Sequence, residues 1–565
     1  MKKTIGDFLL DRLSQIGINT IFGVPGDYNL QFLMQAEKRK DIKFVGNRNE
    51  LNAAYTADGY ARLNGISAIL TTYGVGDLSA LNGVAGAYAE YVPMVCLSGA
   101  PPLHSINQRS FLHHTTAEGN YEDVMNCYRS YTVAQARLTP QNAVGEIDRV
   151  LKVCKREKRP VYIQIPSDIT FFEIDVPDDK LVCSLQMSDS LQLSNLLHGI
   201  KERLRHAERP AMLLGNAIDR FGLRELTQEL IEKLNIPFAT QSAAQAILDQ
   251  GLLQWVGEYN GGASVRSVLD IIENSDCLIG INVKFTDSNS GYFTQNIPEN
   301  MINIMPFSTI VGKKVFEDVC AVDLLKSLIK NDLSRQSNLF SSIHKNKKHS
   351  WTVEKGKALI LNRFWTKMDH FIQENDVIVT DAGTSMRGVR GLALPAGITI
   401  INQPLWLSIG YSLPALFGSL MAAPKRRQIL FVGDGSFQLT AQEVSAFFAH
   451  DLNPIIFLVN NKGYTIERSI MGLYSSFNDI PEWNYHKLFD ALSDNKPYSY
   501  YQVRTEDELE TSLEKLENDT LVPRIVEIMI DPFDIPKKVQ DSADRIASFN
   551  YGKRGLKELD KKVHF

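Results

Sequence analysis

The 565-residue sequence has no long apolar run, no strong excess of either charge and no recognisable cysteine framework. No stretch approaches the roughly 20 apolar residues of a membrane-spanning helix. Asp7, Asp11 and Arg12 interrupt the apolar run near the start, so this run does not resemble a signal peptide. The six cysteines show neither metal-ligand nor disulfide-scaffold spacing. We therefore expect a cytoplasmic protein with reduced thiols and no membrane association.

Basic and acidic residues nearly balance, with 60 Lys and Arg against 65 Asp and Glu and a net charge of -5. This balance provides no basic surface for nucleic acid, so we expect none as a partner. The segment 212–222, MLLGNAIDRFG, lacks the G-x-G-x-x-G spacing of a dinucleotide site, so we expect no NAD or FAD there. The length is typical of a multidomain enzyme.

What the sequence has instead is a regular alternation of short apolar runs and helical patterns. Runs rich in β-branched residues, such as 20–24, 67–72 and 94–98, alternate with amphipathic segments, and this alternation restarts twice along the chain. The pattern predicts an α/β protein with three doubly wound parallel-sheet domains. The predicted parts are an N-terminal domain at 1–180, a middle domain at 188–330, a linker at 331–357 and a C-terminal domain at 358–565.

Two polar turns in the segment 428–467 are the most informative feature. The predicted strand 429–432 leads into Gly433-Asp434-Gly435-Ser436, and the predicted strand 454–459 leads into Asn460-Asn461-Lys462-Gly463. Between them we predict a helix capped by Ser436. Both turns should lie at the carboxyl edge of one parallel sheet, where ligands bind in such folds. The segment 68–99 has a similar pattern, which suggests an internal duplication.

The two turns suit a metal-bound diphosphate. Gly433 and Gly435 allow backbone to approach a ligand closely, and the start of a helix favours an anion. Asp434 and Asn461 provide the oxygen ligands that Mg²⁺ prefers. Either turn alone is common. Together, at opposite ends of one strand-helix-strand unit, they indicate a diphosphate site.

The spacing of these turns, with 24 residues between Gly435 and Asn460, resembles the metal-diphosphate signature of thiamine diphosphate enzymes. Further motifs make nearly the whole chain similar to the 2-oxo acid decarboxylases of the pyruvate, indolepyruvate and branched-chain type. These motifs are GVPGDYNLQFL at 23–33, NELNAAYTADGYAR at 49–62, FLHHT at 111–115 and NQPLWLSIGY at 402–411. The resemblance implies thiamine diphosphate and Mg²⁺ as cofactors, a homodimer as the smallest active unit, and a homotetramer as the expected assembly.

The resemblance also assigns cofactor contacts to residues of this chain. The implied metal ligands are Asp434, Asn461 and the carbonyl oxygen of Gly463. Glu50 hydrogen-bonds the aminopyrimidine ring, the Leu407 carbonyl accepts from it, and Ile409 is the apolar wedge that bends the cofactor. The remaining implied contacts to the cofactor are Thr384, Gly435, Ser436, Thr465 and Ile466.

The implied reaction is non-oxidative decarboxylation of a 2-oxo acid to an aldehyde and CO₂, through a cofactor ylide and an enamine. Four residues match the group that handles protons in the last steps, and Glu50 promotes formation of the ylide. These four are Asp27, His113, His114 and Glu467. From their adjacent positions on an extended segment, the two histidines are expected to point to opposite faces, as poor joint metal ligands.

The substrate is the least constrained part of the prediction. Leu407 stands where the family usually has glycine, and Met386 and Arg387 replace a commonly aromatic pair at the substrate site. Leu407 and Ile466 favour pyruvate or branched aliphatic 2-oxo acids, with aromatic 2-oxo acids as the alternative. Arg387 either faces solvent from a loop or pairs with a second carboxylate. Other open classes are an acetolactate synthase-like carboligase, a flavin-dependent oxidase and a non-catalytic relative.

Overall fold

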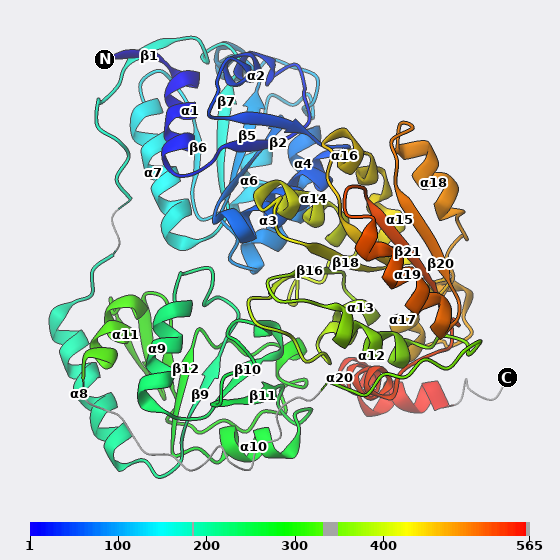
Figure 1. The fold of residues 1–565 in the computed structure, drawn as a ribbon. Helices are drawn as coiled ribbons and strands as arrows, with labels where there is room; N and C mark the ends of the chain where they lie inside the picture. Colours follow the sequence, from blue (N-terminus) through cyan, green and yellow to red (C-terminus); the bar gives the residue numbers. More distant parts are fainter. Residues whose placement is uncertain (184–185, 332–347, 561–565) are drawn as a thin grey trace.

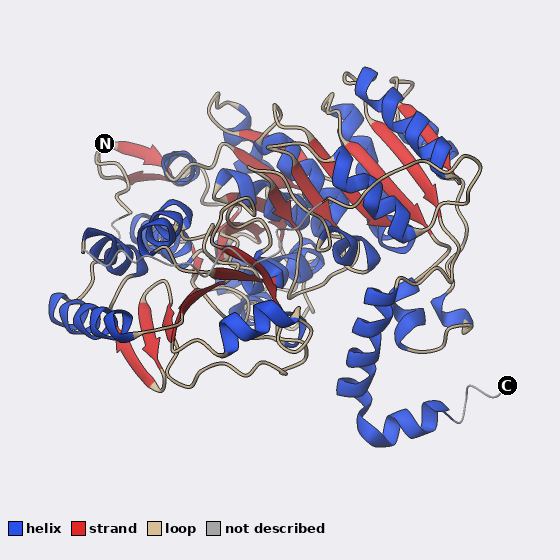
Figure 2. Ribbon diagram, turned by 60° about the horizontal axis from the view of Figure 1, so that its bottom comes forward, coloured by secondary structure: helices blue, strands red, loops and turns tan. Residues whose placement is uncertain are grey.

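The structure, a computed structural model, describes residues 1–183, 186–331 and 348–560. These residues form three sheets of six or seven strands with helices on their faces, and one small two-stranded sheet (Figures 1 and 2). Most of the predicted linker 331–357 lies outside the described residues. No described helix is long and apolar enough to cross a membrane. The cytoplasmic location stays a prediction. The predicted α/β class with three sheet-based domains is confirmed.

The N-terminal sheet has six parallel strands in the order β3-β2-β4-β5-β7-β6. Its strands are β2 (Thr20–Gly23), β3 (Lys43–Gly46), β4 (Ser67–Thr72), β5 (Met94–Ala100), β6 (Gln135–Arg137) and β7 (Val161–Pro166). Its helices are α1 (Ile5–Gln15), α2 (Leu30–Glu37), α3 (Glu50–Asn64), α4 (Val75–Ala89), α5 (Leu103–Asn107), α6 (Asp123–Arg129) and α7 (Ala143–Glu157). A short antiparallel pair, β1 (Lys2–Thr4) and β8 (Glu173–Asp175), lies beside it.

The C-terminal sheet repeats this topology in the order β17-β16-β18-β19-β21-β20. Its strands are β16 (Val377–Thr380), β17 (Thr399–Ile401), β18 (Gln428–Gly433), β19 (Ile455–Asn460), β20 (Ser499–Val503) and β21 (Arg524–Met529). Its main helices are α12 (Leu361–Phe371), α13 (Thr384–Val389), α14 (Ser412–Ala422), α15 (Asp434–Thr440), α16 (Val444–Ala449), α17 (Thr465–Ile470), α18 (Tyr485–Leu492), α19 (Glu506–Asn518) and α20 (Lys537–Asp560). When the strands of each sheet are numbered along the chain, both sheets have the same strand order, which supports the suggested duplication.

The middle sheet is parallel only in part. Its order is β11-β10-β9-β12-β13-β14-β15, and the last two strands are antiparallel. They form a hairpin over a two-residue turn in which Gly312 has a φ of +59°, a backbone conformation that favours glycine. The strands are β9 (Pro210–Leu214), β10 (Phe238–Gln241), β11 (Trp255–Tyr259), β12 (Cys277–Ile281), β13 (Ile302–Ile304), β14 (Ser308–Val311) and β15 (Lys314–Glu317). The helices are α8 (Ser190–His206), α9 (Arg224–Leu234), α10 (Arg266–Glu273) and α11 (Ala321–Lys330).

One apolar cluster contains buried residues from both the N-terminal and the C-terminal domain, and each of these domains also has a cluster of its own. The two apolar clusters of the middle domain contain residues of that domain alone. Helices α3 and α14 approach backbone to backbone at the junction of the N-terminal and C-terminal domains. A Cβ atom at Gly59 would lie 2.1 Å from the Ala415 carbonyl oxygen, and one at Gly418 would lie 1.8 Å from that of Thr56. Buried Glu443 accepts hydrogen bonds across the same junction. The relative position of the two sheets is therefore set by tight contacts.

Candidate functional site

The turn after β18 begins directly with a helix. Gly433 is the N-terminal cap of α15, and Asp434, which is 1 % exposed, is its first residue. Ser436 lies in the first turn and makes no capping contact, so its predicted role as a cap is wrong. The helix begins at Asp434, two residues before Ser436, because the backbone is extended at Gly433 and helical from Asp434 onward. Asp434 and Ser436 are consequently held on rigid backbone at the carboxyl edge of the sheet.

Three oxygen atoms converge between this turn and the next one. The Asn461 amide donates from Nδ2 to Thr465 Oγ1 over 2.7 Å. Its Oδ1 therefore faces the Gly463 carbonyl oxygen at 3.0 Å and Asp434 Oδ1 at 3.1 Å. Adjacent ligands on an octahedral Mg²⁺ with bonds of 2.0–2.1 Å are about 3.0 Å apart. Hydrogen bonding alone favours the opposite orientation, in which the amide nitrogen donates to both oxygens and the amide oxygen accepts from Thr465 Oγ1, whereas a bound cation would favour the oxygen on the metal side.

Asp434 differs from Asp77, its counterpart in the similar N-terminal segment. The Asp77 carboxylate accepts from the hydroxyls of Thr71, Ser98 and Tyr162 at 2.5, 2.8 and 3.0 Å. In contrast, Asp434 Oδ2 is buried without any hydrogen-bond partner. Burial raises the pKa of both carboxyl groups to about 6. The Asp77 site is thus closed by the protein, whereas the Asp434 site lacks a partner that a metal ion would supply.

The glycines of these turns are required by close contacts. A Cβ atom at Gly435 would lie 2.5 Å from the Tyr464 ring, and one at Gly463 would lie 2.2 Å from the Asn478 carbonyl oxygen. Gly463 also has a φ of +142°, which L-amino acids with a side chain rarely adopt. The backbone conformation of Gly463 therefore fixes the direction of its carbonyl group.

Arg468 supports the second turn from behind. Its guanidinium donates to the Lys462 carbonyl oxygen at 3.2 Å and to Asp479 at 2.6 Å. Both contacts line a shallow hollow of about 220 Å³ beside Phe533. The side chain of Arg468 is only 4 % exposed. This buried support holds the turn that carries Asn461 and Gly463.

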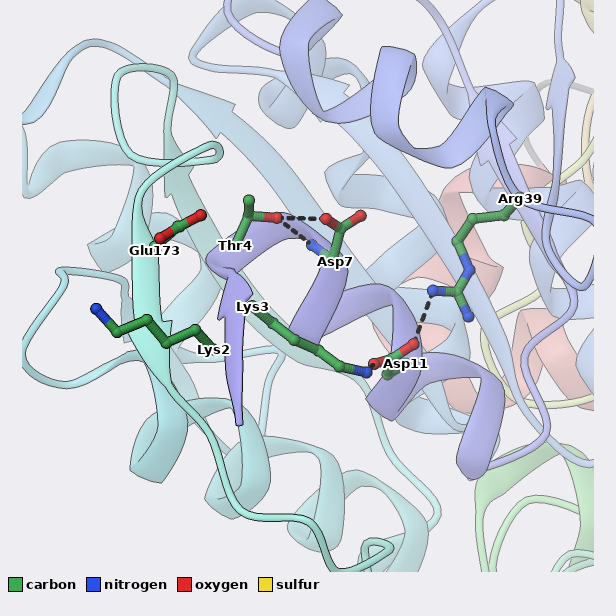
Figure 3. A pocket seen from close by; sticks show the side chains of 7 residues that line it. All are labelled: Lys2, Lys3, Thr4, Asp7, Asp11, Arg39 and Glu173. Carbon is green, nitrogen blue, oxygen red and sulfur yellow. Dashed lines mark hydrogen bonds and ion pairs between the residues drawn. The ribbon is translucent and has the colours of Figure 1, made fainter.

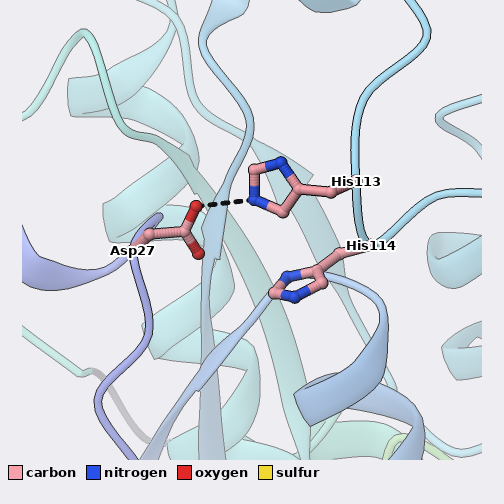
Figure 4. A group of neighbouring side chains, drawn as sticks. All are labelled: Asp27, His113 and His114. Carbon is pink, nitrogen blue, oxygen red and sulfur yellow. Dashed lines mark hydrogen bonds and ion pairs between the residues drawn. The ribbon is translucent and has the colours of Figure 1, made fainter.

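Asp27, His113 and His114 come together in the N-terminal domain (Figure 4). His113 Nε2 lies 2.7 Å from Asp27 Oδ2, and one nitrogen or oxygen atom of each residue lies within 4.8 Å of the others. The expectation that the histidines point to opposite faces is wrong, because the segment turns and His114 has a φ of +61°. Two ligands of one tetrahedral zinc ion are about 3.3 Å apart, so the 2.7 Å contact is a hydrogen bond.

Two residues near the site were not found by the sequence analysis. The Tyr28 ring stacks on His113 with centroids 4.9 Å apart, and burial together with Asp27 raises its pKa to about 12. Buried Asp381 accepts from the backbone and the hydroxyl of Ser412 at 3.0 and 2.6 Å. It thereby joins the end of β16 to the start of α14. Tyr28 lies inside the motif 23–33 next to Asp27, and Asp381 lies three residues before Thr384, but only their contacts distinguish them.

Glu50 is the first residue of α3. The preceding Asn49 caps this helix by accepting from the Asn52 backbone at 2.7 Å. Among the described residues, nothing donates a hydrogen bond to the half-buried Glu50 carboxylate. A Cβ atom at Gly76 would lie 3.2 Å from Glu50 Oε1. Glycine at that position therefore leaves space around a carboxylate that is free to bind a ligand.

The segment with Leu407 and Ile409 lies at the surface of the single chain. These two side chains are 40 % and 38 % exposed. The backbone N–H groups of Leu405 and Trp406 donate to buried Glu90 at 2.8 and 3.3 Å. Leu407 has a φ of +56°, where a side chain costs about 1–2 kcal/mol. This conformation gives a physical reason for the glycine that the family usually has there.

The first turns of α13 and α17 face each other. Thr384, 8 % exposed, begins α13, and a Cβ atom at the preceding Gly383 would lie 3.6 Å from Ile466 Cγ1. Thr465 is the first residue of α17 and follows the turn 460–463 after one intervening residue. Glu467, the residue after Ile466, is exposed. Thr384, Ile466 and Glu467 therefore belong to the same edge of the C-terminal sheet as Asp434.

The predicted site residues thus form two groups in one chain. One group, on the N-terminal domain, contains Asp27, Glu50, His113 and His114. The other, on the C-terminal domain, contains Thr384, Asp434, Gly435, Ser436, Asn461, Gly463, Thr465, Ile466 and Glu467. Among the residues that the structure describes, no hydrogen bond or ion pair joins the two groups.

A larger hollow lies elsewhere, at the start of α1 (Figure 3). Its volume is about 410 Å³, and Lys3 and Arg39 both pair with Asp11 inside it. Its lining residues are Lys2, Lys3, Thr4, Asp7, Asp11, Arg39 and Glu173. Because its charges compensate one another, this hollow offers no comparable site.

Comparisons with known proteins agree with this geometry. Residues 3–122 match the "Thiamine pyrophosphate enzyme, N-terminal TPP binding domain", residues 197–331 the "central domain", and residues 381–528 the "C-terminal TPP binding domain". These matches define the class as thiamine pyrophosphate enzymes.

The chain is also similar to curated relatives over nearly its whole length. It is 36 % identical to the "Alpha-keto-acid decarboxylase" of Mycobacterium leprae (strain TN) over 537 residues, 94 % of each chain. It is equally similar to that of Mycobacterium tuberculosis (strain ATCC 25618 / H37Rv) over 541 residues, 94 % of this chain and 95 % of the relative. The chain belongs to the family of thiamine diphosphate-dependent 2-oxo acid decarboxylases.

Proposed function

We propose that this decarboxylase converts a small or branched aliphatic 2-oxo acid to an aldehyde and CO₂ without oxidation, and that it requires Mg²⁺. The main support is the convergence of Asp434 Oδ1, the Asn461 amide and the Gly463 carbonyl oxygen, beside a second Asp434 oxygen, Oδ2, that has no hydrogen-bond partner among the described residues. When bound, thiamine diphosphate supplies a carbon nucleophile and an acceptor for the electrons released with CO₂.

In this proposal the C-terminal group binds the charged end of the cofactor. Asp434, Asn461 and the Gly463 carbonyl hold Mg²⁺. The hydroxyls of Thr384, Ser436 and Thr465, together with the backbone at Gly435, bind the diphosphate. Thr465 has a second role in the geometry, because it accepts the hydrogen bond that turns Asn461 Oδ1 toward the metal position.

The other end of the cofactor is bound by Glu50, Leu407 and Ile409. Glu50 carries a carboxylate without a partner, which supports its role as hydrogen-bond acceptor for the aminopyrimidine ring. The Leu407 carbonyl would accept from the same ring, and the exposed Ile409 side chain would pack against the cofactor. Ile466 contacts the cofactor from the facing side.

Proton transfer in the last steps is assigned to Asp27, His113, His114 and Glu467. The Asp27–His113 hydrogen bond lets one group compensate the charge that develops on the other. His114 Nδ1 is buried without a partner, so it is available to donate to or accept from a substrate atom. Glu467 contributes from the C-terminal domain.

We infer that the active unit is at least a homodimer, and that a homotetramer is the assembly. Because Glu50 and Asp434 lie in groups without a direct contact in one chain, a complete site needs the second subunit. Exposed apolar side chains of α4, α15 and the segment 402–411 support an interface beside the site. These are Val75, Leu78, Leu405, Leu407, Ile409 and Leu439.

Mixing two inactive variants tests the shared site. Glu50→Gln and Asp434→Ala subunits, mixed in equal amounts and allowed to exchange, are expected to recover about one quarter of wild-type activity. Half of the dimers are then mixed, and each has one intact site. Different affinity tags on the two variants show whether subunits have exchanged. Exchange without any recovered activity would place the complete site within one chain.

Product analysis tests the proposed reaction. With thiamine diphosphate and Mg²⁺, we expect aldehyde as the main product, and kcat/KM for pyruvate or 3-methyl-2-oxobutanoate about 10-fold above that for phenylpyruvate. Ile466 and Leu407 are the physical reason, since they limit the pocket. Best activity on phenylpyruvate would refute the substrate assignment. Acyloin as the main product would favour the alternative hypothesis that the protein is a carboligase.

A further inference from the structure

Arg387 is not a solvated loop residue. It lies in α13, three residues after Thr384, and is half-buried. Its guanidinium makes only long hydrogen bonds, 3.4 Å to the Gly383 carbonyl oxygen and 3.5 Å to Ser542 of α20. The expectation of an outward-facing arginine is therefore wrong, because α13 and α20 enclose the side chain.

No carboxylate among the described side chains forms an ion pair with Arg387. The charged and titratable groups that face it are Arg390 on its own helix, Tyr292 from the middle domain and Glu467 from α17. Burial, and then Arg390, lower its pKa to about 10, so Arg387 is still a cation at neutral pH. Arg390 is also half-buried, and its Nε has no hydrogen-bond partner among the described residues, but Glu258 of β11 offsets part of its charge.

A half-buried cation beside a second cation is unfavourable unless an anion compensates it. Glu467 is the protein's nearest candidate, but it is exposed and forms no ion pair with Arg387. An anionic ligand would complete the site. The position is suitable, because the start of α13 faces Ile466 and Glu467 at the proposed substrate pocket.

The departing carboxylate of the substrate is a poor occupant. A cation on that group stabilises the ground state more than the transition state, in which its negative charge moves away. A carboxylate at the far end of the substrate keeps its charge throughout the reaction. Binding it lowers KM without opposing loss of CO₂.

We propose that Arg387 is a specificity-determining residue that binds the second carboxylate of a dicarboxylic 2-oxo acid, such as 2-oxoglutarate. This inference rests on the proposed decarboxylation and adds dicarboxylic acids, as a second substrate class, to the small neutral acids proposed above. The apolar wall at Ile466 accommodates a short aliphatic chain, and Arg387 selects a charged end on that chain. A planar guanidinium can donate two parallel hydrogen bonds to a carboxylate.

The test compares 2-oxoglutarate with 5-methyl-2-oxohexanoate, whose terminal isopropyl group resembles a carboxylate in shape but has no charge. In the holoenzyme, kcat/KM for 2-oxoglutarate is expected to exceed that for the neutral acid by about 10- to 100-fold, the size of one charge-assisted contact. Arg387→Met should abolish this preference, mainly through KM, and Arg387→Lys should retain part of it. Arg266→Met, which breaks an exposed ion pair on α10, should leave the preference unchanged.

Inhibition provides a second measurement. Glutarate, which has both carboxylates but no reactive carbonyl, should inhibit pyruvate turnover competitively and lose about 10-fold in affinity in Arg387→Met. Equal loss of activity on both test acids would overturn the proposal, because Arg387 would then act on Glu467 or on the fold. A wild-type preference for the neutral acid would also overturn it. If no 2-oxo acid were decarboxylated, the proposed function itself would fail.

Discussion

Replacing Asp434 with alanine is expected to reduce the Mg²⁺-dependent affinity for thiamine diphosphate by at least about 100-fold, which isothermal titration calorimetry measures directly. The carboxylate compensates a metal-bound diphosphate in a buried place, and removing one partner of a buried charge pair costs about 3–5 kcal/mol. Asp434 Oδ1 accepts from the Gly435 N–H, but Oδ2 has no hydrogen-bond partner among the described residues, so the apo-protein loses little when the side chain is removed.

This difference separates a binding defect from misfolding. The apo-form of Asp434→Ala should melt close to the wild-type temperature, but cofactor and Mg²⁺ should no longer raise its melting temperature. Asp451→Ala is a matched control in the same domain, because Asp451 is exposed and pairs only with Lys496. The control should bind like the wild type. Undiminished affinity in Asp434→Ala would disprove the metal-ligand assignment.

Replacing Glu50 with glutamine is expected to slow exchange of the proton on C2 of the bound cofactor by about 100- to 10,000-fold, the usual range for one acid–base group. An amide keeps the size of the side chain but does not provide the carboxylate that the aminopyrimidine ring needs. Deuterium exchange followed by acid quench and NMR reports this step without any substrate. Affinity for the cofactor should change much less.

His114→Gln is the informative comparison for Glu50→Gln. His114 belongs to the group with Asp27 and His113, which we assign to proton transfer after CO₂ has left. This variant should therefore retain most of the C2 exchange and turn over slowly. If it blocked exchange as completely as Glu50→Gln, the division of roles between the two groups would be wrong.

Much of the fold could be predicted because the strands are buried on both faces. Strand β4 was predicted with the observed bounds, and α3 starts at the predicted residue. The hairpin β14–β15 was missed because its short strands are half-exposed and carry no continuous apolar run. Helix α4 starts five residues earlier than predicted, because its first turn contains glycines that weaken a helical pattern.

The two histidines show a limit of reasoning from neighbouring residues. An extended backbone would separate their side chains, but a left-handed residue at His114 turns both rings toward Asp27. The contact partners come from segments about 86 residues apart, between which no periodic pattern exists. The exposure of Arg387 could not be predicted from neighbouring residues either, because it depends on a contact with α20, which is far away in the sequence.

Local patterns were enough to predict the α/β class and the cofactor family, which are confirmed, whereas the metal-ligand roles of Asp434 and Asn461 stay predictions. Strand periodicity, turn glycines and motif spacing are properties of neighbouring residues, so they can be read along the chain. Only the three-dimensional arrangement distinguished Asp434, whose Oδ2 has no hydrogen-bond partner among the described residues, from the hydrogen-bonded Asp77, and left Arg387 half-buried with no ion pair among those residues. Burial and hydrogen bonding depend on atoms from segments far apart in the chain, and these atoms meet only when the domains pack.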